Sequence, residues 1–158
     1  MTDNKIYWDQ LKKTDPRFTK RINKGFGEIT TIDPQWQIMK MTEVFGPVGI
    51  GWAYNVKYTY TDQLVFAEVS VWTKDDVSSH DGYGPVCSVQ KLWRKTGALD
   101  DEAPKKAMTD AMTKALSHLG MSADVFLGMF DNSKYVEKVA AEYKSLNKSK
   151  VTEMKGNT

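Results

Sequence analysis

The stretch from Ala103 to Gly120, APKKAMTDAMTKALSHLG, decides the fold that we predict for this chain. Its apolar residues recur every three or four positions, a spacing that places side chains on one face of a helix. These residues are Ala107, Met108, Ala111, Met112, Ala115, Leu116 and Leu119. Small apolar side chains allow such a helix to lie very close to a sheet, and Gly120 is well suited to end it. We therefore predict a helix from Pro104 to Leu119 whose opposite face carries cations and hydroxyls.

A second helix is predicted upstream of this stretch. Asp33 is a favourable N-cap and Pro34 suits the first helical position, and an apolar stripe then continues as far as Phe45. Gly46 and Pro47 interrupt the pattern, because a glycine and a proline in succession disfavour further helix. The sequence therefore predicts a helix that begins at Pro34 and ends at Phe45.

Three extended segments follow between the two helices. Along residues 52–60, large apolar and aromatic side chains alternate with smaller or polar ones, and along 64–72 valines and an alanine occupy every second position. The short polar link at 61–63 predicts a hairpin turn between these two segments. Residues 80–89 form a third extended segment that two glycines and a proline make irregular. The order of helices and strands predicts an α+β fold, in which a three-stranded antiparallel sheet packs against the long helix with further helices at its flanks.

The two ends of the chain carry weaker patterns. Near the N-terminus we predict a short helix over Tyr7–Lys13 and a basic linker through Gly25 and Gly27. After the long helix, an apolar turn over 123–130 leads to a final helix from about Ser133 to Leu146. The chain is accordingly divided into three parts, which are a basic N-terminal segment at 1–28, a core at 29–146 and a polar, disordered tail at 147–158.

The composition restricts the classes of protein to consider. A chain of 158 residues is long enough for one domain with a real core, and its net charge of +2 does not by itself indicate a nucleic-acid partner. The single cysteine excludes an internal disulfide framework and suits a reducing cytoplasm. No apolar run reaches the roughly 20 residues that span a membrane. The polar N-terminus lacks a signal-peptide pattern, so we expect a cytoplasmic protein without a membrane partner.

Catalytic and metal-binding patterns are weak in this sequence. His80, His118 and Cys87 are too widely spaced for a zinc site, and Cys87 lies in an apolar stretch typical of a packed thiol. A magnesium-dependent nuclease could draw on carboxylates, but those available do not form a recognisable set. The candidates by residue type are Glu68, Asp75, Asp76 and Asp81. We therefore expect no enzymatic activity, no catalytic or metal-binding residues and no cofactor.

Binding of single-stranded nucleic acid is the chemistry that the remaining residues favour. It requires cations spaced along a groove and planar groups that order the bases. The predicted long helix offers Lys106 and Lys114, and Lys91, Arg94 and Lys95 lie close to Trp93 in the sequence. The aromatic residues of the first two predicted strands fit core and sheet packing equally well, so on these residues alone both interpretations stay open.

Three blocks in the same order resemble the Rad52 family. QIMKMTEVFG at 37–46, followed by GWA at 51–53, resembles its helix and Gly-Trp strand entry. HDGYG at 80–84 is similar to its third-strand segment, and KKAMTDAMTKALSHLG at 105–120 is similar to its long helix. The resemblance covers about Thr31 to Tyr135, roughly two thirds of the chain. Its small size favours the phage relatives, which are single-strand annealing proteins.

This resemblance implies both a fold and a function. The implied fold is a β-β-β-α core that assembles into a homo-oligomeric ring, with single-stranded DNA in a positively charged groove. The implied function is ATP-independent annealing of complementary strands in phage-type homologous recombination and DNA repair. The resemblance places this activity in the cytoplasm of a bacterial host and implies a partner exonuclease. Two alternatives remain, namely a single-strand-binding protein that does not anneal and a protein-interaction scaffold of a recombination locus.

The resemblance transfers unevenly to individual residues. Where the family places three cations on its long helix, this chain has Thr113, Lys114 and Ser117, so one charge and two hydroxyls remain. A family arginine just before the apolar run of the first helix corresponds to Trp36, which could stack on a base but carries no charge. Nearby cations could compensate for the missing charges. The predicted nucleic-acid-binding residues are therefore Lys114, Lys106, Arg94, Lys95, Thr113, Ser117, Lys91 and Trp36.

Overall fold

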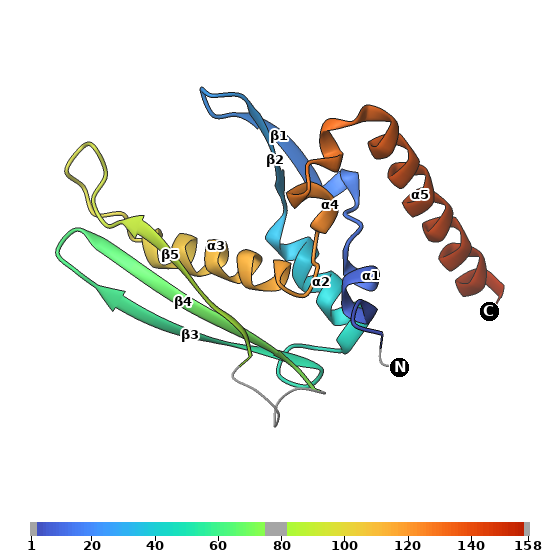
Figure 1. Ribbon diagram of the computed structural model, residues 1–158, viewed down its shortest axis with the longest axis horizontal. Helices are drawn as coiled ribbons and strands as arrows, with labels where there is room; N and C mark the ends of the chain where they lie inside the picture. Colours follow the sequence, from blue (N-terminus) through green and yellow to red (C-terminus); the bar gives the residue numbers. More distant parts are fainter. Residues whose placement is uncertain (1–2, 75–81, 157–158) are drawn as a thin grey trace.

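An antiparallel sheet of three strands and a long helix form two layers of the molecule (Figure 1). The computed structural model describes residues 3–74 and 82–156. The strands β3 (Trp52–Tyr60), β4 (Leu64–Thr73) and β5 (Tyr83–Lys91) lie side by side in chain order, and α3 (Ala103–Ser117) packs on β4 and β5. The predicted α+β fold with a three-stranded antiparallel sheet and helices is confirmed.

Alternation along β4 explains why the helix covers one face of the sheet. Every second residue from Val65 to Val71 has no exposed surface, whereas the residues between them are half-buried on the other face. On the helix, Ala107, Ala111 and Ala115 are also fully buried. Alanine side chains leave little bulk between the two layers, so α3 lies close to the sheet as its sequence predicts.

The helix α2 (Pro34–Phe45) begins and ends where the sequence predicts. A carboxylate oxygen of Asp33 accepts a hydrogen bond from the backbone N–H of Gln35 at 2.9 Å, which caps the helix start. The chain then turns back so tightly that a Cβ atom on Gly51 would overlap the carbonyl oxygen of Phe45. This close approach delivers Trp52 into the core beside Met41, where both side chains are buried.

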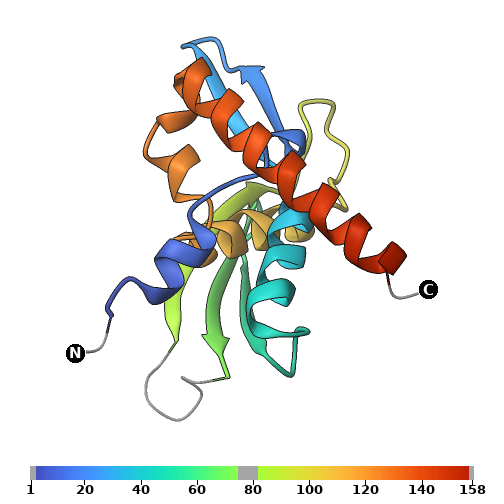
Figure 2. The same ribbon diagram turned by 90° about the vertical axis from the view of Figure 1, so that its right-hand side faces the viewer.

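A β-hairpin replaces the linker expected near the N-terminus. After α1 (Ile6–Leu11) and the 3-10 turn η1 (Pro16–Phe18), β1 (Thr19–Asn23) pairs with β2 (Glu28–Ile32) in an antiparallel register. The two glycines of the expected basic linker have positive φ angles in the turn that connects the strands. The hairpin crosses the expected division at 28/29. Figures 1 and 2 show α3 lying between this hairpin and the three-stranded sheet.

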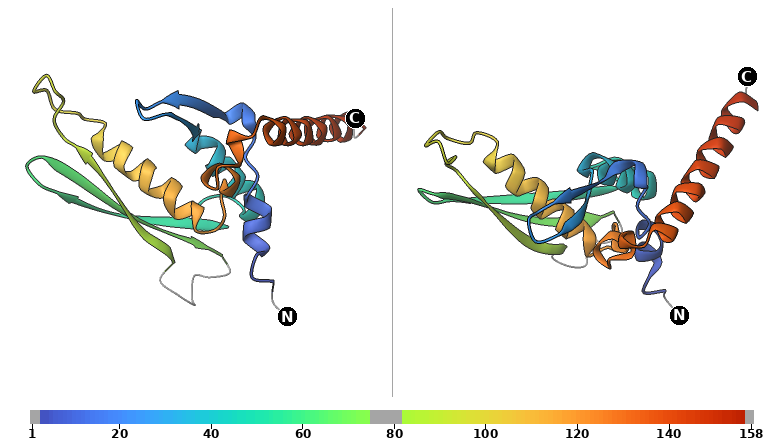
Figure 3. Two further views of the ribbon diagram at one scale, coloured as in Figure 1. Left: turned by 45° about the horizontal axis from the view of Figure 1, so that its top comes forward. Right: turned by 90° about the horizontal axis from the view of Figure 1, so that it is seen from above.

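The C-terminal helix is longer than predicted. Beyond α4 (Ala123–Phe126) and the turn η2 (Met129–Asp131), α5 (Ser133–Gly156) continues for ten residues past the expected end at Leu146. These ten residues belong to the segment expected to form a polar, disordered tail. Val139 is the one buried residue of this helix, and Figure 3 shows α5 projecting away from the sheet and α3.

Asp124 ties the N-terminal segment to α4 and α5. Its buried carboxylate accepts hydrogen bonds from the backbone N–H of Thr14 at 2.9 Å and from the Thr14 hydroxyl at 2.7 Å. The Tyr135 hydroxyl donates a further hydrogen bond at 2.9 Å. Burial raises the pKa of Asp124 above its ordinary value in spite of these donors. Burial, followed by the Asp124 carboxylate, also raises the pKa of Tyr135.

Candidate functional site

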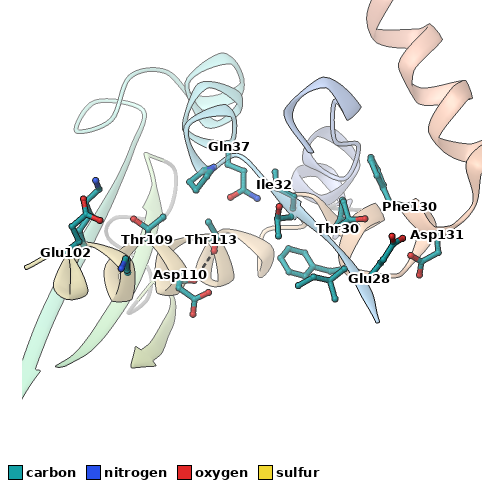
Figure 4. Close-up of a pocket in the computed structure, with 17 residues that line it drawn as sticks. Glu28, Thr30, Ile32, Gln37, Glu102, Thr109, Asp110, Thr113, Phe130 and Asp131 are labelled. Carbon is teal, nitrogen blue, oxygen red and sulfur yellow. Dashed lines mark hydrogen bonds between the residues drawn. The ribbon is translucent and has the colours of Figure 1, made fainter. Parts of the chain in front are cut away.

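A groove of about 770 Å³ lies between the polar face of α3 and the N-terminal hairpin (Figure 4). One wall is strand β2, and α3 residues from Glu102 to Thr113 form another. Pro34 and Gln37 of α2 contribute to the lining, as do side chains from α4 and η2. The alanine face of α3 packs against the sheet, so the opposite face of the helix lines this groove.

Hydroxyls and carboxylates dominate the polar lining of the groove. Thr30 and Thr31 belong to β2, and Thr109 and Thr113 belong to α3. The charged residues of the lining are Lys105, Lys106, Glu28, Glu102, Asp110 and Asp131. Carboxylates outnumber cations within a single chain, which differs from the positively charged groove that the resemblance implies.

Two buried polar atoms of the groove lining lack a protein partner. Gln37 has no exposed surface, and its amide nitrogen donates a hydrogen bond to the Ser122 hydroxyl at 3.2 Å. Its carbonyl oxygen, Oε1, and the hydroxyl oxygen of Thr30 have no hydrogen-bond partner among the described residues. An unsatisfied buried polar atom is costly, so both atoms would gain from a donor that entered the groove.

A second cleft, of about 650 Å³, brings together three of the predicted cations. Lys91, Arg94 and Lys95 line it together with Trp93, whose side chain is 46% exposed. The indole N–H of Trp93 donates to the backbone oxygen of Asp62 in the β3–β4 turn at 2.8 Å, which fixes the ring. We call these four residues the basic cleft. Within the described part of the chain, Lys91 and Lys95 form no ion pair.

Asp100 joins the basic cleft to the groove. Its carboxylate lies 3.0 Å from the ammonium of Lys106 on α3 and 3.5 Å from the guanidinium of Arg94. The hydrogen bond from Lys106, helped by the backbone N–H of Glu102, holds the pKa of Asp100 below its ordinary value. Two predicted DNA-binding cations therefore share one carboxylate in the free protein.

The predicted residues of the second half of α3 are engaged within the helix. Lys114 lies 3.1 Å from Asp110, which also accepts a hydrogen bond from Ser88 of β5 at 2.6 Å. The Thr113 hydroxyl donates to the backbone oxygen of Asp110, and the Ser117 hydroxyl donates to that of Lys114. Thr113 lines the groove, whereas Lys114 and Ser117 lie outside its lining.

Two expectations for single side chains are wrong. Trp36 is only 3% exposed and packs against the rings of Phe18 and Tyr143, so it is not available to stack on a base. The amphipathic stripe of α2 turns this residue into the core. Cys87 is exposed rather than packed, because it pairs with Glu68 on the face of the sheet that α3 does not cover.

Sequence reasoning missed the wall that β2 and Gln37 supply. The usable signal was EITTI at 28–32, whose β-branched residues favour a strand and which follows two glycines. Within residues 3–74 and 82–156, no group of three metal-ligating side chains comes together and no helix is long and apolar enough to cross a membrane. His80, Asp75, Asp76 and Asp81 lie outside the described residues, as does the start of the HDGYG block.

The chain has no match among the protein-family models, the curated proteins or the solved structures with which it was compared.

Proposed function

We propose that this protein binds single-stranded DNA and anneals complementary strands without ATP. The observation that supports this best is the basic cleft, in which Lys91, Arg94 and Lys95 surround an exposed and fixed Trp93. Cations along a groove attract the phosphate backbone, and an aromatic ring stacks on any base without sequence preference. This combination meets the requirements for binding a single strand.

The ion pairs at Asp100 provide the path by which the strand continues toward α3. The side chains of Arg94 and Lys106 are about half exposed, whereas the Asp100 side chain is only 13% exposed. A phosphate that approaches from solvent can therefore reach either cation, and it competes with Asp100 for both. The strand then passes from the basic cleft to the groove that Lys105 and Lys106 help to line.

Annealing follows from binding when the bases stay accessible. Neutralising phosphates removes repulsion between two complementary strands, and a shallow interface leaves bases free to pair. Copies of the chain arranged side by side in a homo-oligomeric ring would extend the interface along the strand. These properties are also what the resemblance to the Rad52-like annealing proteins implies.

Pairing of two complementary oligonucleotides, one carrying a fluorophore and the other a quencher, tests the proposal. Protein without nucleotide should accelerate quenching relative to buffer alone, and the labelled strands should stay intact on a denaturing gel. No acceleration, with tight binding of each strand, would favour the single-strand-binding alternative. Failure to bind either strand would leave only the scaffold alternative. A light-scattering mass measured in parallel tests the proposed homo-oligomer.

A further inference from the structure

The lining of the groove contains two oxygen atoms without a hydrogen-bond partner among the described residues. Gln37 is fully buried, and Figure 4 shows its side chain directed from α2 toward the other groove residues. Its Oε1 atom and the Thr30 hydroxyl oxygen both lack a partner within the described residues. The Gln37 carbonyl oxygen only accepts, and a hydroxyl oxygen can accept as well as donate, so a ligand with N–H donors would satisfy both atoms.

The charges of the groove indicate that this ligand group is not a phosphate. Glu28, Glu102, Asp110 and Asp131 all line the groove, and a phosphate among these carboxylates would be repelled. The apolar part of the lining includes Phe126, whose side chain is 54% exposed and offers a ring on which a planar group can stack. A flat, uncharged group with N–H donors fits this lining.

We infer that the groove of each copy binds one nucleobase that carries an exocyclic amino group, as a subsite of the DNA interface. The base held in this way does not pair while it is bound, whereas the other bases of the strand stay accessible. The amino group has two N–H donors, which match in number the oxygens of Gln37 and Thr30. The phosphates on either side of this nucleotide would contact Lys105 and Lys106 of the groove lining. This inference rests on the proposed function, because it assigns a base-selective role to one part of the same interface.

A pair of homopolymers that differ only in the base edge tests the inference. Oligo(5-methyl-dC) and oligo(dT) share ring size and methyl group, but the first has an amino group where the second has a carbonyl oxygen. The wild-type protein should bind the first about five- to tenfold more tightly, the effect of one or two added hydrogen bonds to buried acceptors. Equal affinity for both homopolymers would overturn the inference.

Two variants locate the source of the preference. Gln37→Leu removes the amide at similar volume, and Thr30→Val removes the hydroxyl with almost no change of shape. Each should bring the affinity ratio toward one while leaving oligo(dT) affinity within about twofold of the wild type. Thr59→Val, on an exposed strand position remote from the groove, should keep the full ratio.

The outcomes separate this inference from the proposed function. A wild-type ratio that persists in Thr30→Val and in folded Gln37→Leu would overturn the groove as the source of selectivity, although DNA binding would stand. Failure of the wild-type protein to bind either homopolymer would instead refute the proposed function. A cooperative thermal unfolding transition establishes that each variant is folded. If Gln37→Leu does not fold, the binding ratio of Thr30→Val decides the test.

Discussion

Replacing Asp100 with asparagine should increase the affinity of the protein for single-stranded DNA. The carboxylate of Asp100 lies 3.0 Å from Lys106 and 3.5 Å from Arg94, so it competes with phosphate for both cations. Its other oxygen contact is a hydrogen bond from the backbone N–H of Glu102 at 3.1 Å, just before α3 begins. Asparagine can accept the same hydrogen bond, so D100N removes the charge and keeps this support for the helix start.

The expected size of the effect follows from the geometry. A phosphate oxygen about 3 Å beyond the Lys106 ammonium would lie about 6 Å from the Asp100 carboxylate. Two like charges at about 6 Å repel by about 0.7 kcal/mol at the dielectric constant of bulk water. Removing one of them should therefore tighten binding about threefold. If one further phosphate is neutralised, the slope of log affinity against log salt should steepen by about 0.7.

Fluorescence anisotropy of labelled oligo(dT), titrated between about 50 and 200 mM salt, measures both quantities. Asp9→Asn is a matched control, because Asp9 also lies 3.0 Å from a lysine, Lys12, and its replacement changes net charge equally. D9N, in α1 and remote from the cleft, should bind like the wild type. An equal gain in DNA affinity in D9N and D100N would show that the effect comes from net charge and not from Asp100. No gain in a folded D100N would refute the assignment of Lys106 and Arg94 to the interface.

Three further predictions test the aromatic contact, the buried acid and the fold. Trp93→Ala should weaken single-strand binding by about 1–3 kcal/mol in the same anisotropy assay, while Trp93→Phe, which keeps a ring, should lose much less. Burial raises the pKa of Asp124 in the folded state, so ionisation of this carboxyl disfavours folding. The free energy of unfolding of the wild type, measured in urea, should therefore fall relative to that of Asp124→Asn as the pH rises from about 3 to 7. A difference that stays constant with pH would contradict this prediction. Gly51→Ala should destabilise by about 2–4 kcal/mol through the clash with Phe45, whereas Gly156→Ala, with open space around it, should not lower the unfolding temperature.

Local patterns predicted the sheet and the two central helices because each carries its own periodicity. The helix α2 has a cap and a terminator within the chain, and α3 has an apolar face that continues for four turns. The β1–β2 hairpin was missed because Lys20, Arg21 and Lys24 mark the segment as basic and polar, and because neither strand contains a fully buried residue. The length of α5 was missed for a related reason, since beyond Leu146 its residues are exposed and amphipathicity gives no signal.

The candidate site was predicted less completely, because side-chain direction depends on tertiary packing. Lys91, Arg94 and Lys95 do gather beside Trp93, since they are neighbours in sequence. The side chain of Trp36 packs into the core, and nothing about a single tryptophan in the sequence predicts whether it will be buried or exposed. The carboxylates that share the groove with Lys106 come from β2, η2 and α3 with its preceding residue, so the charge balance of the groove could not be predicted from α3 alone.

Under the proposed function, a chain with a net charge of only +2 gains a firm hold on DNA through repetition of its basic cleft along the strand. In the described part of the chain, one basic cleft supplies Lys91 and Lys95 without an ion pair, and Arg94 only in competition with Asp100. A few phosphate contacts give weak and strongly salt-dependent binding for one copy. Copies held side by side on one strand multiply these weak contacts, because each later contact is intramolecular. Each single contact stays weak enough to release, and that release allows two bound strands to slide until their bases pair. Under the proposed function, near-neutrality therefore favours annealing over permanent coating, provided that the protein acts as an oligomer.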